Sequence, residues 1–305
     1  MKLPLVDWTG WSPQAIDAFG PRWHALTQRD FVLRGAATAM TAPPRRSALT
    51  AKFALGGVEH YRAGDAQLAA DEDTWVVLAP GELYSSRIAG GATVTTVAGF
   101  YALDTVGAAR TVRRTRESVL LDEDGHVGAL DEPLPIGRRR MRFGRDLRAA
   151  VQAVAVDADA DAVGELHALA LGAIIAACDE ALHERERLPC MRASTRAEIH
   201  RRLARAHDRL MTEYAASLDL AELARTAAMA PHHFLRRFSD VFGMTPHRAL
   251  VARRVERARR LLATTDLPVA EIATAVGFAS AAGFSTRFRR ETGVTPRAFR
   301  TSQFR

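Results

Sequence analysis

Two stretches near the C-terminus of this 305-residue chain repeat one another. Residues 218–246 read LDLAELARTAAMAPHHFLRRFSDVFGMTP, and residues 267–296 read LPVAEIATAVGFASAAGFSTRFRRETGVTP. The first halves align at an offset of 49; after one inserted residue the offset becomes 50, and both copies close on Gly-x-Thr-Pro. Solenoids need about three or more neighbouring repeats, so two copies predict a small helical module used twice.

The first copy predicts a helix, a short turn and a second helix. Asp219 and Glu222 form a capping pair at the start of an apolar helical pattern. A break near residues 228–230 precedes a second helix over residues 231–242, in which the phenylalanines recur on one stripe. Gly243 then predicts a left-handed helix end, and Thr245-Pro246 a new helix start.

The second copy predicts the same structure, with a turn at Gly277, a helix over about 280–291 and a stop at Gly293. Thr295-Pro296 opens the next helix. In helix-turn-helix proteins a short first helix supports a second one that lies in the DNA major groove. The repeat therefore predicts two such units.

Residues 247 to about 264 predict one amphipathic helix between the copies, with arginines on its flanks. Its 18 or so residues span about 27 Å, close to the roughly 34 Å between successive major-groove faces on one side of DNA. The helix could hold two reading helices one DNA turn apart. The alternative is an ordinary helical bundle with exposed arginines.

Charge separates the two halves of the chain. Residues 192–305 carry 21 arginines, no lysine and 10 acidic residues, whereas residues 1–191 carry 21 basic and 25 acidic residues. The basic excess thus lies wholly in the part that holds the repeat, as expected for binding to the phosphate backbone.

Residues 196–300 resemble the DNA-binding domain of the AraC/XylS family of bacterial transcription regulators. The matching segments are LAELA at 220–224, HHFLRRF at 232–238, GMTPHRAL at 243–250, the RxxRARRLL pattern to residue 262, VAEIATAVGF at 269–278 and GVTPRAFR at 293–300. The lead-in at 195–210 is similar too. The resemblance implies a DNA reader that contacts two adjacent major grooves.

The same resemblance implies which side chains meet DNA. The expected base contacts are His232, His233, Leu235 and Arg236 in the first unit, and Ser280, Ala281, Ala282, Ser285 and Thr286 in the second. The expected phosphate contacts are Arg237, Arg287 and the helix N-termini at Thr245 and Thr295.

Arg236 could pair bidentately with guanine, a contact worth about 1–3 kcal/mol of discrimination. Thr286 departs from the family pattern, in which arginine is common at that position. Ala281 and Ala282 can touch thymine methyl groups but donate no side-chain hydrogen bonds. We therefore expect the first unit to carry more base specificity and the second more backbone positioning.

The N-terminal half has a different pattern, in which short β-prone runs alternate with Gly-rich turns from residue 31 to about 100. Such spacing predicts an antiparallel barrel or sandwich. The segment resembles the small cupin-type barrel of many regulators in this family, so the predicted fold class is α+β multidomain. Barrels of this size can enclose one small ligand.

No metal or other cofactor is expected in this barrel. His60 is the lone histidine of the central strand region, and Glu59 and Glu82 lack histidine companions, whereas a metal site needs three or four ligands. The candidate pocket residues are Tyr61, Trp75, Tyr84 and Arg87, with packing as the alternative for each.

Between the two regions, residues 143–188 predict two helices around a DADAD stretch at 157–161. The apolar run LHALALGAIIAAC at 166–178 is too short to span a bilayer. It predicts either a helix packed on the barrel or a dimer seam, and we favour the seam. Arg138–Arg140 predict a solvated turn.

The predicted domains are 1–142 (sensor), 143–194 (helical dimerisation segment) and 195–305 (DNA-binding). No signal peptide is evident, and Cys178 and Cys190 form no CxxC or zinc pattern, so we expect a cytoplasmic, nucleoid-associated protein. The expected function is a regulator, an activator by resemblance, that binds promoter DNA and a small effector. We further expect the protein to form a homodimer, to have RNA polymerase as a possible partner and not to bind a membrane.

Two alternatives remain. One is a constitutive DNA-binding protein without a ligand. The other is a DNA-repair enzyme sharing this reader, which would need a reactive cysteine in an electropositive setting. Neither cysteine has such flanking residues, so we expect no enzymatic activity.

Overall fold

The computed structural model describes residues 3–9, 29–64, 66–110, 139–157, 159–189 and 192–303. Contacts divide the chain into two compact units, Met1–His183 and Glu184–Arg305. Residues 143–183, which we predicted as part of a separate helical segment, group with the strands of the first unit. Each unit is described by itself.

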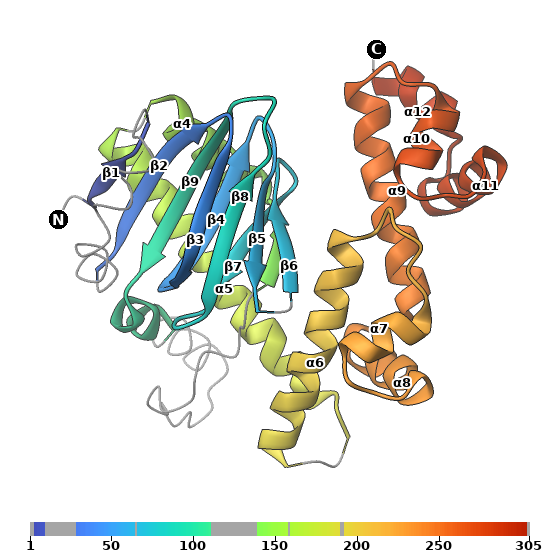
Figure 1. The fold of residues 1–305 in the computed structure, drawn as a ribbon, viewed down its shortest axis with the longest axis horizontal. Coiled ribbons are helices and arrows are strands. Elements are labelled where there is room, and N and C mark those ends of the chain that lie inside the picture. The colour runs from blue at the N-terminus through green and yellow to red at the C-terminus, as the bar shows by residue number, and fades with distance from the viewer. Residues whose placement is uncertain are drawn as a thin grey trace, which may run out of the picture. The chain divides into compact units, whose positions relative to one another are not determined.

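The strands of the first unit form two separate sheets (Figure 1). The larger has the order β1-β2-β9-β4-β7-β10, and the smaller the order β3-β8-β5-β6. Their bounds are β1 Leu5–Asp7, β2 Phe31–Ala37, β3 Met40–Arg46, β4 Leu49–Leu55, β5 Glu59–Ala63, β6 Ala66–Ala70, β7 Thr74–Leu78, β8 Leu83–Ile88, β9 Val94–Tyr101 and β10 Arg139–Arg142. Neighbouring strands are antiparallel except for the parallel pair β1–β2.

The prediction of a closed cupin-like barrel is wrong. Within the described residues no ladder of hydrogen bonds joins one sheet to the other, so each sheet keeps its own edges. The two sheets instead pack face to face through a buried cluster that includes Tyr61 and Tyr84 from the small sheet and Val76 and Leu78 from the large one. Alternating side chains on each strand make this contact possible.

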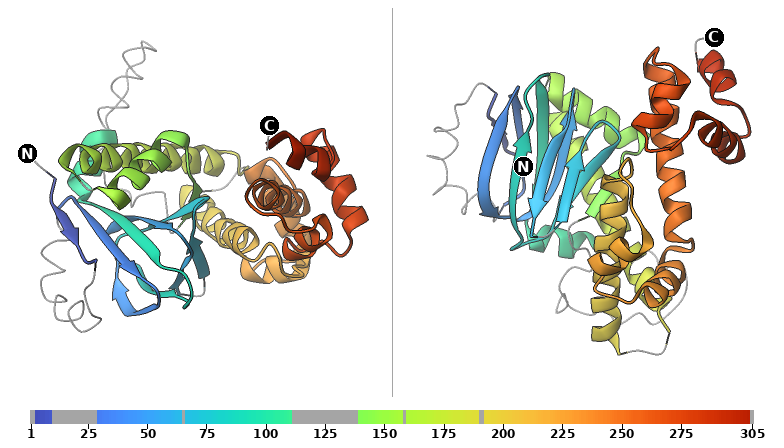
Figure 2. Two further views of the ribbon diagram at one scale, coloured as in Figure 1. Left: turned by 90° about the horizontal axis from the view of Figure 1, so that it is seen from above. Right: turned by 45° about the vertical axis from the view of Figure 1, so that its right-hand side comes forward.

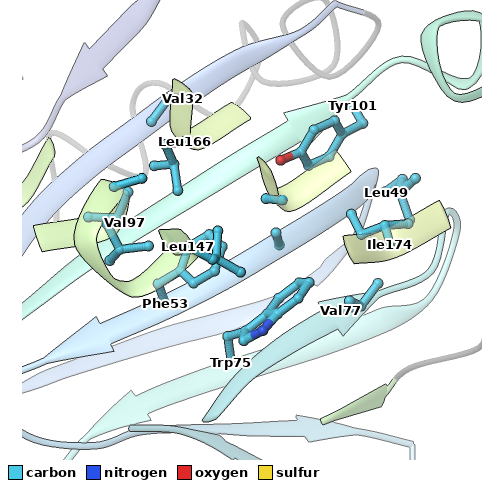
Figure 3. Close-up of a cluster of buried hydrophobic side chains, with 14 of the residues drawn as sticks. Val32, Leu49, Phe53, Trp75, Val77, Val97, Tyr101, Leu147, Leu166 and Ile174 are labelled. Carbon is cyan, nitrogen blue, oxygen red and sulfur yellow. The ribbon is translucent and has the colours of Figure 1, made fainter. Parts of the chain in front are cut away.

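Helices α4 (Arg145–Val156) and α5 (Ala160–Glu186) cover the other face of the large sheet (Figures 1 and 2). Figure 3 shows their Leu147 beside Phe53, Leu166 beside Val32 and Ile174 beside Leu49, all in one buried cluster. The unit therefore has three layers: small sheet, large sheet and helices.

Helix α5 takes the first of the two roles weighed for residues 166–178, because its apolar residues pack on the sheet. Ile174 and Cys178 of that run are buried in this cluster. At 27 residues, α5 is by length and composition the one helix of the described chain that could cross a membrane. Its buried side chains instead complete the core of this unit.

Besides β1, three short strands had not been predicted. Arg139–Arg142, two residues of which fall in the expected solvated turn, form β10 and pair with β7. The second, β6, pairs with β5. The third, β3, contains Pro43-Pro44 at a break in its pairing with β8, and it lies at the edge of its sheet, where prolines remove no ladder bond.

The second unit is entirely helical in its described part. Its helices are α6 Ala193–Thr212, α7 Leu220–Thr226, α8 Pro231–Phe242, α9 Pro246–Thr264, α10 Val269–Ala275, α11 Ala281–Thr292 and α12 Pro296–Gln303. Helices α7–α8 and α10–α11 are the two predicted helix-turn-helix units, and α9 is the predicted connecting helix (Figure 1).

Candidate DNA-binding surface

The first helix-turn-helix unit begins with a capping box. The Asp219 carboxylate accepts a hydrogen bond from the Glu222 backbone N–H at 2.6 Å, and the Glu222 side chain accepts one from the Asp219 N–H at 3.3 Å. The chain then turns at Ala228, which has a φ of 50°. Pro231 starts α8, and Gly243 ends it with a φ of 67°. These contacts confirm the predicted capping pair and helix end.

Helix α8 presents one buried and one exposed face. Phe234, Phe238 and Val241 are buried against the rest of the unit, while His232, His233 and Arg236 are exposed. Positions 232, 233 and 236 share a helix face. The three residues expected to read bases from the start of α8 therefore lie together and open to solvent, and Leu235 beside them is half-buried.

Arg237 is held by its own helix. Its Nε donates to His233 Nε2 at 3.2 Å, and its guanidinium pairs with Asp240 at 3.3 Å. The side chain is mostly buried, with 17% exposed. The guanidinium thus holds the His233 ring in place, and a phosphate would have to compete with Asp240 for the guanidinium.

The second unit has the same geometry with different chemistry. Gly277 makes the turn with a φ of 88°, Ser280 caps α11 by accepting from the Gly283 N–H at 3.1 Å, and Gly293 ends the helix. The hydroxyls of Ser285 and Thr286 donate to carbonyls one turn back.

Those bonds leave the hydroxyls only acceptor capacity towards DNA. Ala281, Ala282 and Thr286 are exposed, whereas Ser285 and Arg287 are half-buried. The reading face of α11 is therefore poor in donors. Sequence reasoning did not single out Arg289 and Arg290, which are exposed at the end of this helix; the run RFRR at 287–290 was the signal for them.

Helix α9 contributes side chains to the cores of both helix-turn-helix units. Ala249 and Leu250 pack with α7 and α8, whereas Val255, Ala258 and Leu262 pack with α10 and α11. Its 19 residues span about 28 Å. Figures 1 and 2 show the first helix-turn-helix unit at one end of α9 and the second helix-turn-helix unit at the other.

Three of the arginines expected on the flanks of α9 serve the inside of the domain. Arg253 is 4% exposed and donates to the Met211 carbonyl at 3.3 Å. Arg254 donates to the carbonyls of Tyr214 (2.7 Å) and Ala216 (2.9 Å), and burial lowers its pKa. Arg257 donates to the Tyr214 hydroxyl at 3.1 Å. These bonds fix the segment after α6 along α9.

Two further helix N-termini are open. Thr245 and Thr295 are exposed and cap α9 and α12 by accepting from backbone N–H groups at 3.3 Å. Pro246 and Pro296 follow them, as predicted. Helix N-termini attract anions, so both ends are suited to phosphate.

One family model matches this part of the chain. The family model described as a helix-turn-helix domain matches residues 223–302. The C-terminal domain is an AraC-type helix-turn-helix domain. The AraC-type domain is 42% identical over 81 residues to the HTH-type transcriptional regulator Rv1931c of Mycobacterium tuberculosis, covering 27% of this chain and 31% of that protein.

Two other relatives match the AraC-type domain. The bifunctional transcriptional activator/DNA repair enzyme AdaA of Bacillus subtilis is 35% identical over 96 residues, which covers 30% of this chain and 46% of AdaA. The crystal structure of the DNA-binding domain of AdpA, in complex with a target DNA, is 35% identical, with a TM-score of 0.32, and covers 33% of this chain and 90% of that one. The chain spans about a third of the length of its first curated relatives.

The ligand candidates of the first unit lie in three places. Tyr61 and Tyr84 are buried between the sheets, with ring centroids 6.3 Å apart. Trp75 lies on the opposite face of the large sheet and donates to the Arg142 carbonyl at 3.1 Å. Arg87 is exposed, as is His60, with which it pairs across the small sheet. Trp75 and Arg87 therefore do not share a site with the two tyrosines.

Proposed function

We propose that the chain is a sequence-specific transcription regulator that binds double-stranded promoter DNA through two adjacent major grooves. The supporting observation is the pair of helix-turn-helix units packed on one helix, each with the start of its second helix exposed. The AraC-type domain and the basic excess of residues 192–305 agree with this role. It would place the protein at the bacterial nucleoid in the cytoplasm.

In this proposal the residues named from the sequence divide into two tasks. His232, His233, Leu235 and Arg236 read base edges in the first groove, and the α11 face positions the second unit on the other groove. Arg236 carries most of the discrimination, since it alone among these exposed residues offers a bidentate donor pair. Thr245, Thr295, Arg237 and Arg287 hold phosphates.

The first unit would act as a sensor. A small molecule bound there, or a homodimer formed by residues 143–194, would shift the population of DNA-binding states. Activation through RNA polymerase is the expected output. The alternative of a constitutive DNA binder predicts the same DNA contacts and no effect of any metabolite.

One relative raises the alternative that the chain is a DNA-repair enzyme. The printed name of AdaA includes a repair enzyme, but the match covers under half of that protein. Cys178 is fully buried in the helix–sheet core of the first unit, and a repair nucleophile must reach its substrate. Cys190 lies outside the described residues. These facts favour the regulator.

The test is fluorescence-anisotropy titration of the full chain on DNA from upstream of its own and neighbouring genes, with a shuffled sequence as control. We expect selective binding that Arg236→Ala reduces by about 1–3 kcal/mol on the specific site and much less on the shuffled DNA. Arg62→Ala, an exposed change in the first unit, is the matched control. Equal affinity for all fragments would leave only a backbone binder and reject the proposal.

A further inference from the structure

The first unit contains a pocket between its two sheets, beside edge strand β3. Its volume is about 70 Å³, enough for several water molecules. Leu33, Met40 and Ala98 contribute apolar surface, and Thr41 and Pro43 on β3 lie exposed at its border. The irregular pairing of β3 with β8 between Ala42 and Arg45 falls at the same place. β-bulges are common where a sheet edge borders a site.

Two cationic side chains line this pocket. Lys52 comes from β4 of the large sheet, and Arg45 from β3 of the small one. The Lys52 ammonium lies 5.0 Å from the ring centroid of Phe100 and 5.5 Å from that of Tyr84, and the Arg45 guanidinium lies 5.7 Å from the same Tyr84 ring. The Tyr84 ring is thus close to both positive charges, those of Lys52 and Arg45.

Lys52 has no carboxylate partner in the described part of the chain. Glu59 lines the same pocket and is 5% exposed, yet no described contact pairs it with Lys52. Burial, and after it the negative charge of Glu59, raises the pKa of the Tyr61 phenol well above its usual range. Among the described residues, the ring faces of Tyr84 and Phe100 are the groups in contact with the Lys52 ammonium.

This arrangement favours an anion of a particular kind. Among the described residues that line the pocket, Lys52 and Arg45 are cations and Glu59 is a carboxylate, and Ser86, which is also buried there, adds a hydroxyl. The apolar surface requires that the anion carry a hydrocarbon part. Charge-assisted hydrogen bonds from ammonium and guanidinium groups to a carboxylate are among the strongest polar contacts in proteins.

We propose that this pocket binds a small organic carboxylic acid, with its carboxylate on Lys52 and Arg45 and its hydrocarbon part on the apolar wall. The inference rests on the proposed function, since it names the chemical class of the effector. Lys52 supplies the main charge, and Glu59 disfavours competing dianions because its own negative charge lies in the same cavity.

The test uses the full chain and isothermal titration calorimetry with defined probes: the straight-chain carboxylates from acetate to octanoate and phenylacetate, each beside its primary amide. We expect at least one carboxylate to saturate at or below about 1 mM and its amide to bind about tenfold or more weakly. Lys52→Met should lower that carboxylate affinity about tenfold, Lys52→Arg should restore most of it, and Glu59→Gln should raise it.

Arg87→Met is the matched control, because it removes one positive charge from the exposed face of the small sheet, and we expect no change. Tryptophan emission verifies that each variant is folded. Equal binding of acid and amide, equal losses in Lys52→Met and Arg87→Met, or no saturation by any carboxylate would each overturn the inference. Selective DNA binding by the same samples separates that failure from a failure of the proposed function.

Discussion

Arg236 and Arg253 carry the same guanidinium group in opposite surroundings. Arg236 is exposed on the outer face of α8, whereas Arg253, 17 residues later, is buried on α9. The buried group donates to the Met211 carbonyl, pairs with Glu256 at 3.2 Å and lies over the Tyr214 ring at 5.1 Å. One arginine is available to a partner, and the other holds the domain together.

Arg253→Met should therefore destabilise the AraC-type domain. The Met211 carbonyl and Glu256 would lose a buried donor, which costs about 2 kcal/mol of unfolding free energy. Urea unfolding followed by circular dichroism at 222 nm measures it. Arg225→Met, on the exposed side of α7, should change stability by less than about 0.5 kcal/mol. Equal effects of the two variants would show that the buried contacts stabilise nothing.

His167 gives the first unit a dependence on pH. Its ring stacks on Tyr101 at 4.5 Å, and its Nε2 lies 3.9 Å from an Asp30 carboxylate oxygen. Burial lowers the pKa of His167, a shift that the nearby Asp30 opposes. The folded unit thus favours the neutral ring, and its stability is fully present above the unfolded pKa of about 6.5 and declines as the pH falls below it.

We expect His167→Phe to remove this decline between about pH 7 and 5, because phenylalanine keeps a ring against Tyr101 and cannot take a proton. All four tryptophans of the chain precede residue 76, so their emission during urea unfolding reports the first unit. The readout is the slope of stability with pH and not its absolute value. An unchanged slope in the variant would assign the decline to other groups.

At the scale of elements, the two helix-turn-helix units have different residues at their turns. Ala228 and Gly277 occupy equivalent positions 49 residues apart, and both have a positive φ. A side chain at such an angle costs roughly 1–2 kcal/mol, which glycine avoids. A Cβ added to Gly277 would also lie 2.6 Å from the Ala215 carbonyl oxygen. The first turn tolerates alanine with strain, and the second leaves it no space.

Ala228→Gly should stabilise the domain by about 0.5–1 kcal/mol, and Gly277→Ala should destabilise it by more than about 2 kcal/mol. Gly293→Ala is the control for the angle alone, since its φ is 80° and a Cβ there meets nothing within 4 Å; we expect a loss of about 1 kcal/mol. Thermal unfolding followed at 222 nm ranks the three. A Gly277→Ala loss no larger than that of Gly293→Ala would show that the Ala215 contact relaxes freely.

At the scale of the whole molecule, charge is divided between the units. The 21 arginines of residues 192–305 outnumber the acidic residues there two to one, while residues 1–191 carry a small negative excess. Binding to DNA should consequently release many counterions. If about six phosphates are neutralised, affinity falls about a thousandfold between 50 and 200 mM salt.

Anisotropy titration of one DNA fragment across that salt range measures the slope. Arg287→Ala, which removes one proposed phosphate contact, should lower the slope of log K against log salt by about 1. Arg236→Ala should instead change the preference among sequences. A slope near zero would mean that the arginines do not meet the backbone.

The C-terminal domain was predictable almost to the residue, because its signals are local. Capping pairs, Gly-Thr-Pro stops and apolar spacing fixed α8 at 231–242 and α9 to within one residue. The sheet arrangement was not predictable, since closure of a barrel depends on pairing between distant strands. Lys52 and Glu59 were missed because alternation alone does not say which face of a strand points inward. Likewise, nothing in the sequence distinguishes Arg253 from its exposed neighbours.

The two prolines in β3 have one more effect. A strand at the edge of a sheet offers unpaired backbone groups to any extended chain, and such edges seed aggregation. Proline lacks an N–H, and the break in pairing beside Pro43-Pro44 distorts the remaining groups. The edge that borders the pocket can thus stay open to solvent and to small molecules. Other extended chains in the cell, including nascent ones, would find few backbone groups there with which to extend the sheet.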